Sequence, residues 1–368
     1  MIYADNAATT RLDIEAFEAM KPYLLNDYSN PSQPYAFSRS SKKAIKEARQ
    51  IIAECIGADP DEIYFTSGGT ESDNWAIKGV AMYGSQKKCV ITSEFEHHAV
   101  LRSCESLEYQ GYPVSYVKPT TDRIVTSEKL KEIIHSPALV SIMYANNEIG
   151  TIQPIRELVD IAHQYGAYFH TDAVQAIGHI QIDVKELGVD LLSASAHKFN
   201  GPKGIGFLYI KKGARILPLL NGGSQENALR GGTENVASIV GMAIALKNSC
   251  TNIQKDETHI NAVSNAFISN LKVEYHINGN CNKITGINSI SFNGKSGESL
   301  LHLLDLKGIC VSTGSACDSV NTQISHVLQA IDVAEEIAKS TIRVSFSKDN
   351  TVEEAIQIAE AINILVSI

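Results

Sequence analysis

The feature that most constrains the fold is a repeated alternation between segments with helical periodicity and apolar segments of strand length. The alternating segments, helical and strand-like in turn, lie at 127–135, 139–145, 154–164, 167–171, 183–187 and 190–196. Strands that are apolar on both faces and separated by helices predict βαβ crossovers, so we expect an α/β fold with a mainly parallel sheet sandwiched by helices. The ligand crevice of such a sheet lies at the carboxyl ends of its strands.

Elements of the same kind are expected before residue 127. Apolar residues recur at three- and four-residue spacing from Ser40 to Ile56, which predicts an amphipathic helix, and Gly57 follows as its C-cap. A short strand is expected at 63–66, and a further helix is expected to begin near Thr70.

The C-terminal third has a different pattern, a smaller α+β arrangement that follows a helix expected from about Asn235 to Ser249. Its expected helices are at 255–271, 298–307 and 351–366, and its expected strands are at 287–292, 309–312 and 341–346. A chain of 368 residues favours two domains. We therefore expect a large domain over residues 13–250 and a small domain made of residues 1–12 together with 251–368.

Composition disfavours several partners and locations. The 41 acidic and 32 basic side chains give a net charge of 32 − 41 = −9, and the basic residues are scattered, which disfavours nucleic acid as a direct partner. The N-terminus lacks the basic start and apolar stretch of a secretory signal. The longest near-apolar run, Val236–Leu246, is shorter than a membrane span of roughly 20 residues. A soluble, cytoplasmic protein is expected.

The seven cysteines show no CxxC pair and no regular spacing. This pattern predicts neither a disulfide framework nor a zinc signature, and no metal site is expected. Six of the seven are expected to be structural or inert thiols: Cys55, Cys89, Cys104, Cys250, Cys281 and Cys310.

Cys317 has a different setting. The residues before it, 312–316, are small and polar, and Asp318 follows it, which predicts an exposed loop instead of a core strand. A thiol placed there is reactive because it is accessible, although the neighbouring carboxylate raises the pKa of a thiol and reduces its thiolate fraction.

A glycine-rich turn lies between the strand expected at 63–66 and the helix that follows it. The turn reads TSGGTES over residues 66–72. Two glycines let the backbone approach an anion, and the unpaired N–H groups at the positive end of the helix stabilise phosphate. Simple capping, with Thr70 as the N-cap, is an equal alternative for this turn alone. The turn is not a P-loop, because no Lys-Ser or Lys-Thr follows the second glycine at the required position.

Two other strand ends carry charged side chains. Asp172 follows the strand at 167–171, where it could pair with a protonated pyridine nitrogen or a metal, or serve as a helix N-cap. Lys198 follows the strand at 190–196. Most lysines are solvated, but a desolvated lysine at a strand end can lose its proton and form a Schiff base. An anion-binding turn, an acid and a lysine in this order are what pyridoxal phosphate needs.

With these motifs in place, the chain resembles the cysteine desulfurases of the class V aminotransferase group, which are fold type I pyridoxal-phosphate enzymes. The resemblance covers essentially the whole chain. It rests on nine segments in order: 3–10 (YADNAATT), 66–74 (TSGGTESDN), 96–97 (EH), 146–150 (NNEIG), 170–175 (HTDAVQ), 195–198 (SAHK), 204–206 (GIG), 230–235 (RGGTEN) and 312–317 (STGSAC). Weak singly, these segments are highly specific in combination.

The resemblance implies a reaction and its partners. L-Cysteine is converted to L-alanine, and the sulfur is held as a persulfide on Cys317 and passed to an acceptor for iron–sulfur cluster, thio-cofactor or tRNA sulfur delivery. The alternatives are another class V enzyme, such as an aminotransferase or a selenocysteine lyase, and a non-catalytic paralogue that binds partners. The paralogue would lack the equivalents of Lys198 or Asp172, which are present.

The resemblance also implies roles for matched positions. Lys198 forms the covalent link to the cofactor, Asp172 pairs with its ring nitrogen, and His97 stacks on the ring and moves protons. Without the resemblance, His97 and His98 indicate only loop histidines, since no HExxH spacing is present. Further cofactor contacts come from Gly69, Thr70, Gln175, Ser195 and His197, with Thr233 from a second subunit, and the substrate carboxylate contacts are Asn147 and Arg343. A homodimer with shared active sites follows. Residues 321–325 and Asn227 depart from the usual pattern of the family.

Overall fold

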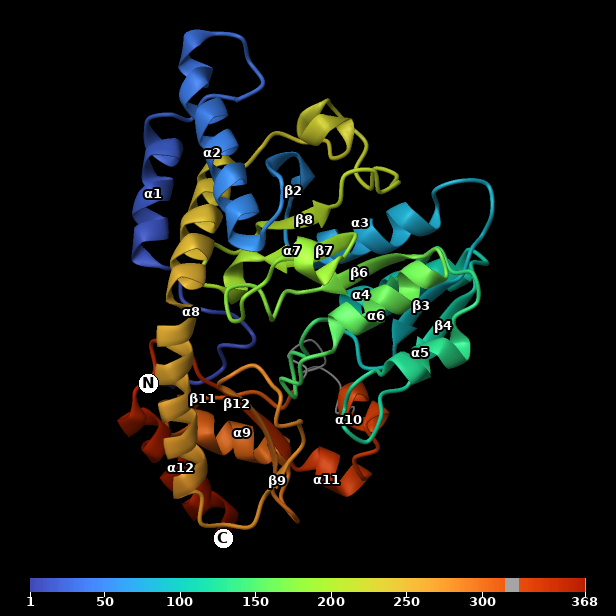
Figure 1. The fold of residues 1–368 in the computed structure, drawn as a ribbon. Helices are drawn as coiled ribbons and strands as arrows, with labels where there is room; N and C mark the ends of the chain where they lie inside the picture. The colour runs from blue at the N-terminus through green and yellow to red at the C-terminus, as the bar shows by residue number, and fades with distance from the viewer. Residues whose placement is uncertain (315–323, 368) are drawn as a thin grey trace.

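The computed structural model describes residues 1–314 and 324–367, and its centre is a seven-stranded sheet (Figure 1). The strands run in the order β2-β8-β7-β6-β5-β3-β4, and β8 is antiparallel to β2 and β7 while all other pairs are parallel. Their bounds are β2 Ile63–Thr66, β3 Val90–Ser93, β4 Val114–Val117, β5 Leu139–Ser141, β6 Tyr168–Asp172, β7 Leu191–Ser195 and β8 Gly206–Ile210. The predicted α/β fold with a mainly parallel sheet is confirmed.

Helices cover both faces of this sheet because successive strand residues point to opposite faces. On β7, Leu191 belongs to a core cluster with residues of α3 (Gly69–Ala81) and α4 (His98–Tyr109). The next residue, Leu192, belongs to a second cluster with α2 (Arg39–Ile56) and α6 (Ile155–Gln164). The other α-helices that begin before α8 are α1 Ile14–Leu25, α5 Ser127–Ile133 and α7 Val184–Leu187. Gly57 caps α2 with φ +71°, which confirms the predicted C-cap.

A second, smaller assembly lies below the central sheet in Figure 1. Strand β10 (Ile287–Ser291) pairs antiparallel with β12 (Thr341–Ser345) and β9 (His276–Ile277), and β1 (Ile2–Tyr3) pairs parallel with β11 (Ile309–Cys310). Helices α9 Gly297–Asp305 and α12 Val352–Ser367 pack in this assembly, whereas the buried apolar residues of α10 His326–Ala330 and α11 Glu335–Lys339 belong to the core cluster that contains Leu192. This assembly has its own apolar core, and both ends of the chain lie in this lower part of the molecule.

Helix α8 differs from the sequence expectation. Two helices were expected, at 235–249 and 255–271, but α8 runs unbroken from Val236 to Asn270. The residues between the two expected helices contain no glycine or proline, so nothing ends the first helix. In Figure 1, α8 connects the upper and lower parts of the molecule. Residue 250 lies inside this helix, and the division of the chain into residues 13–250 and the remainder stays a prediction.

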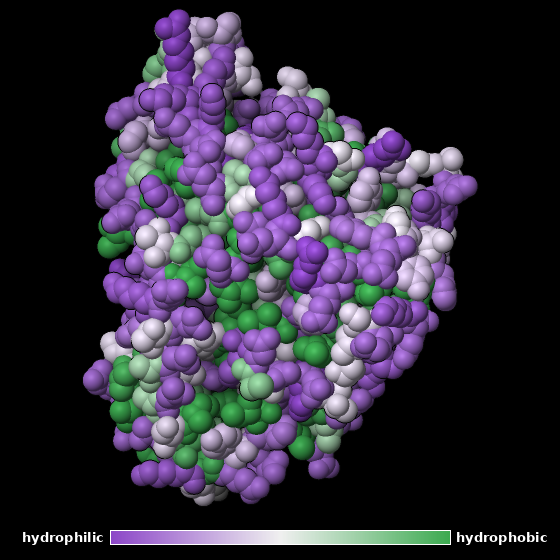
Figure 2. Space-filling model, in the orientation of Figure 1, coloured by the Kyte–Doolittle hydropathy of each residue, from purple (hydrophilic) through white to green (hydrophobic). Residues whose placement is uncertain are grey.

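The apolar surface of the molecule is unevenly distributed. Figure 2 shows a mostly hydrophilic upper part and hydrophobic side chains gathered in the middle and lower part of the same face. Among the described residues, α8 alone is long and apolar enough to pass a length-and-composition test for a membrane span, and 56% of its most apolar window is buried inside the protein.

Candidate active site

A cavity of about 500 Å³ opens at the carboxyl ends of β6 and β7, beside the N-terminus of α3. This is the place where a parallel α/β sheet is expected to bind its ligand. The cavity gathers ten of the predicted site residues from six separate segments of the chain: Gly69, Thr70, His97, Asn147, Asp172, Gln175, Ser195, His197, Lys198 and Arg343. Cys317 lies outside the described residues.

One end of the cavity is formed by the first turn of α3. The helix starts at Gly69 with Gly68 as its N-cap, and no side chain caps it. The alternative in which Thr70 caps this helix is therefore wrong, and Thr70 lies inside the first turn, exposed at the cavity. The first N–H groups of a helix have no partner within the helix, so this end can bind an anion.

The turn before α3 also needs glycine at Gly206, which lies beside it on β8. A Cβ atom at Gly206 would lie 2.4 Å from the carbonyl oxygen of Ala194 and 2.8 Å from the Cα of Gly68. Both neighbours are backbone atoms, which cannot move without shifting the sheet or the turn. We expect Gly206→Ala to lower the free energy of unfolding by about 1–3 kcal/mol, measured by urea denaturation.

Gly223→Ala is the control for this substitution. The three atoms nearest to an added Cβ at Gly223 all belong to the flexible side chain of Gln225. Equal unfolding midpoints for the two variants would contradict the proposed backbone clash at Gly206.

Asp172 ends β6 and is 5% exposed. Its Oδ1 accepts a hydrogen bond from the N–H of Val174 at 2.9 Å. A turn follows instead of a helix, so the helix N-cap alternative is wrong. Burial raises the pKa of Asp172, and the Val174 N–H and the Lys198 ammonium oppose this shift.

Lys198 lies in a short 3₁₀ helix that follows β7, Ala196–Lys198. Its Nζ donates hydrogen bonds to the carbonyl oxygens of Ala7 at 2.6 Å and Ala8 at 2.9 Å. The N-terminal segment thus returns from the small assembly to hold this side chain. Gln175 joins the same contact, because its Nε2 donates to the oxygen of Ala7 at 2.9 Å.

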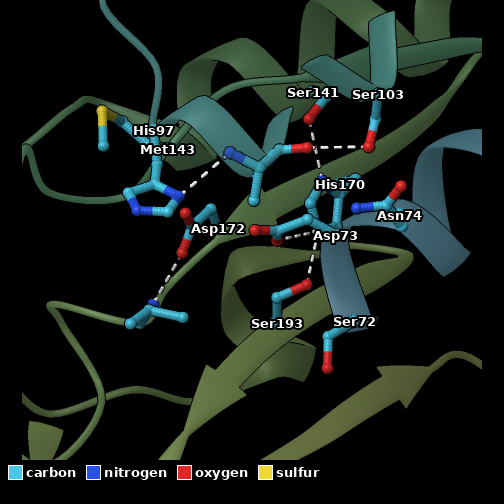
Figure 3. Close-up of polar contacts among 12 residues, drawn as sticks. Ser72, Asp73, Asn74, His97, Ser103, Ser141, Met143, His170, Asp172 and Ser193 are labelled. Atoms are coloured by element: carbon cyan, nitrogen blue, oxygen red, sulfur yellow. Dashed lines mark hydrogen bonds and ion pairs between the residues drawn. The ribbon is translucent and has the colours of Figure 1, made fainter. Parts of the chain in front are cut away.

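His97 is the N-cap of α4, and its Nδ1 accepts a hydrogen bond from the N–H of Ala99 at 3.1 Å. In Figure 3 its ring lies close to Asp172. Burial, and then the nearby Lys198, lower the pKa of His97 to about 4. The ring is therefore neutral near pH 7, and because Nδ1 accepts, its proton is on Nε2.

Two more predicted residues come from β7 and the turn after it. Ser195 ends β7, and His197 follows two residues later, with its Nδ1 3.2 Å from the hydroxyl of Thr9. Burial, followed by the charges of Lys198 and Lys203, lowers the pKa of His197 to about 4. A neutral His197 can donate a hydrogen bond from one ring nitrogen while accepting at the other.

Arg343 reaches the cavity from β12, on the opposite side from α3, and is 2% exposed. Its Nη1 donates to the carbonyl oxygen of Asn147 at 2.7 Å, and its Nη2 donates to Asp5 at 2.8 Å. Its Nε is buried without a hydrogen-bond partner among the described residues. A buried guanidinium with a spare donor at a cavity suits a carboxylate ligand.

Thr233 is the one described site residue that this cavity does not include. It lines a separate cavity of about 160 Å³ together with Arg230 and Glu234. Ser67 and Gly204 line both cavities, so the two are neighbours.

The site contains three acidic residues that the sequence analysis did not assign. Asp73 and Glu148 both line the cavity, and Asp5 pairs with Arg343. Ligand atoms of Asp73, His97 and Asp172 all lie within 4.8 Å of one another, a grouping that could hold either a metal ion or an organic cation. Asp73 lies five residues after Gly68 on the cavity side of α3. A charged residue on an otherwise buried helix face was the sequence feature that could have indicated its role.

Comparison with known proteins identifies the family. The model of the family described as "Aminotransferase class-V" matches residues 2–358. A curated "Cysteine desulfurase IscS" of Dictyoglomus turgidum is 50% identical over 96% of this chain and 91% of that protein. A solved structure titled "NIFS-LIKE PROTEIN" superposes with a TM-score of 0.94 at 38% identity, covering 100% of this chain and 99% of that chain. Another, titled "SspA in complex with cysteine", gives a TM-score of 0.85 at 35% identity over 94% and 99% of the two chains. The chain belongs to the class-V aminotransferase family.

Proposed function

We propose that this protein is a pyridoxal-phosphate-dependent cysteine desulfurase that converts L-cysteine to L-alanine. The observation that carries the proposal is the meeting of Lys198, Asp172 and the N-terminus of α3 in one cavity, with Arg343 on its opposite side. Relatives named cysteine desulfurase and a related structure titled as a complex with cysteine support the same reaction.

The residues present fit pyridoxal phosphate. The uncapped first turn of α3 suits the phosphate. A side chain at Gly69 would crowd this turn, since a Cβ there would lie 2.7 Å from Val174 Cγ2. The buried carboxylate of Asp172 suits a protonated ring nitrogen. The cavity of about 500 Å³ lies within the range of roughly 300–1,000 Å³ usual for small-molecule and cofactor sites.

We assign the cofactor contacts from this geometry and from the family motifs. Lys198 would attach the cofactor and move the proton at Cα of the substrate, and Asp172 would keep the ring nitrogen protonated. Neutral His97 would pack on the ring, and Gln175 would bind its phenolic oxygen. The phosphate is held by the first turn of α3 and the strand end after β7: Gly69, Thr70, Ser195 and His197. When bound, pyridoxal phosphate withdraws electrons from the substrate through its protonated ring.

The substrate carboxylate is assigned to Asn147 and Arg343, and the acceptor of sulfur to Cys317. In the overall reaction the Cβ–S bond of L-cysteine breaks and a bond forms between that sulfur and the sulfur of Cys317. Cβ gains a hydrogen atom in return, so L-cysteine and a thiol give L-alanine and a persulfide. The reaction needs no external oxidant or reductant.

We further propose a homodimer in which the partner subunit's Thr233 completes the phosphate site. The separation of Thr233 from the cofactor cavity of its own chain supports this arrangement. The persulfide is passed to a sulfur-acceptor protein in the cytoplasm. The net charge of −9 disfavours nucleic acid as the direct recipient.

The test is turnover of L-cysteine by the cofactor-loaded protein, with L-alanine and sulfide both measured under reducing conditions. Equal amounts of the two products are expected. In Cys317→Ala, sulfide release falls toward the level of free cofactor without protein, because the attacking thiol is missing. Cys281→Ala is the control, since Cys281 is exposed and lies outside the cavity. A native rate of sulfide release in Cys317→Ala contradicts the assignment of the nucleophile.

The same assay separates the rival class V activities. A selenocysteine lyase releases selenide from L-selenocysteine and turns over L-cysteine poorly. An aminotransferase forms alanine only when pyruvate is supplied as the 2-oxo acid that accepts the amino group. Alanine and sulfide in equal amounts without a 2-oxo acid exclude both alternatives.

A further inference from the structure

Asp172 has a second buried carboxylate beside it. Asp73, on α3, is 1% exposed, and its Oδ1 has no hydrogen-bond partner among the described residues. Carboxylate oxygens of Asp73 and Asp172 lie within 4.8 Å of each other. Figure 3 shows the two side chains facing one another from α3 and β6. Two ionised carboxylates this close and this deeply buried repel each other strongly.

The groups around Asp73 do not supply a positive charge for it. His170, on β6, is fully buried between the hydroxyls of Ser141 at 2.8 Å and Ser193 at 2.9 Å, with its Nε2 3.7 Å from Asp73 Oδ1. Burial lowers the pKa of His170 to about 3, so its ring is neutral. His97 is neutral for the same reason.

The remaining titratable neighbours are an acid and the cavity lysine. Glu96 is fully buried and accepts hydrogen bonds from Ser93 and from the N–H of Met143, and burial raises its pKa to about 8. Lys198 acts electrostatically on Asp172. Within the described part of the chain, one cation therefore faces the pair of aspartates, and it favours ionisation of Asp172.

We propose that Asp73 is a positioning residue that stays a neutral carboxylic acid at neutral pH, leaving Asp172 as the single anion that faces the ring nitrogen of the cofactor. Burial raises the pKa of Asp73, and the charge of Asp172 raises it further. A neutral acid avoids the repulsion that would turn the Asp172 carboxylate away from the ring. The identity of the cofactor in this proposal rests on the proposed function.

The test uses the cofactor-free protein and compares native unfolding with that of Asp73→Asn as a function of pH. An acid whose pKa is raised by folding holds its proton in the native state and releases it on unfolding. Native stability relative to the variant therefore falls as pH rises above the unfolded pKa of about 4. We expect the ratio of the native to the variant unfolding constant to rise about tenfold per pH unit until the raised pKa is reached.

Asp305→Asn is the control for surface charge, because Asp305 is exposed at the end of α9. Its pH dependence should follow that of the native chain. A pH-independent difference between the native chain and Asp73→Asn, or a native chain that gains stability over this variant as pH rises, overturns the proposal.

Infrared spectroscopy gives a second measurement that does not depend on the folding of Asp73→Asn. The native cofactor-free protein should show the C=O band of a protonated carboxylic acid at neutral pH. Glu96→Gln removes the contribution of Glu96 to the intensity of this band and should leave the contribution of Asp73. Loss of the whole band in Glu96→Gln overturns the proposal.

A third measurement addresses the positioning role. Pyridoxal phosphate should bind more weakly to Asp73→Ala than to Asp73→Asn. The asparagine amide has the shape of the neutral acid and can support Asp172, whereas alanine cannot. Equal weakening in both variants overturns the positioning role. If L-cysteine is not turned over while the pH dependence and the infrared band appear as expected, the proposed reaction fails and the neutral acid stands.

Discussion

Replacement of Lys198 by alanine is expected to abolish covalent retention of pyridoxal phosphate and to slow L-cysteine breakdown by about 100- to 10,000-fold. The amine of Lys198 is held at the cavity by the carbonyl oxygens of Ala7 and Ala8. Alanine removes both the group that attaches the cofactor and the base at Cα. The measurement is borohydride reduction of the loaded protein followed by mass spectrometry, together with the rate of alanine formation.

Lys203→Ala is the matched control, because Lys203 is an exposed lysine that lines the same cavity. Its loaded and reduced form should keep the added mass of the cofactor. A cofactor adduct that persists in Lys198→Ala and disappears in Lys203→Ala would show that the attachment point is misassigned.

The strands of the central sheet could be predicted from the sequence where they form short, fully apolar segments between helical patterns. The strands ending at Asp172 and Ser195 are short and apolar on both faces, so they could be recognised without knowledge of their neighbours. Strands β3, β4 and β8 were not predicted, although they are as long as the strands that were. The continuous helix α8 was predicted as two helices. Its first half packs in the apolar core of the upper part and its last third packs in that of the lower part, and the polar residues between them interrupt the apolar pattern.

Site residues could be predicted from the sequence where a charged residue directly follows an expected strand. Asp172 and Lys198 were found in this way, and the family resemblance supplied Arg343 and Asn147. Asp73 and Asp5 were not found, since their importance depends on which charges fold next to them. Asp5 is 338 residues from its partner Arg343, so no local pattern could indicate their ion pair.

Asp172→Asn is the second large prediction, with an expected loss of about 100- to 1,000-fold in the rate of L-cysteine breakdown. The amide keeps the shape of the carboxylate but cannot hold a proton on the ring nitrogen through its charge. Affinity for pyridoxal phosphate should fall as well, measured by equilibrium dialysis.

Burial raises the pKa of Asp172, so this carboxylate takes up a proton in mildly acidic solution. Native affinity should therefore fall as pH decreases toward that pKa, while the affinity of the variant stays flat.

Asp190→Asn separates this charge effect from the general cost of removing a buried carboxylate. Asp190 is 5% exposed, as Asp172 is, but its oxygens bind His163 and the N–H of Phe169 away from the cavity. Its replacement should lower the free energy of unfolding and leave cofactor affinity and its pH dependence as in the native chain. Equal losses of affinity in both variants would mean that Asp172 acts through folding alone. A loss confined to Asp172→Asn, with a flat pH profile, ties the carboxylate to the charge of the ring nitrogen.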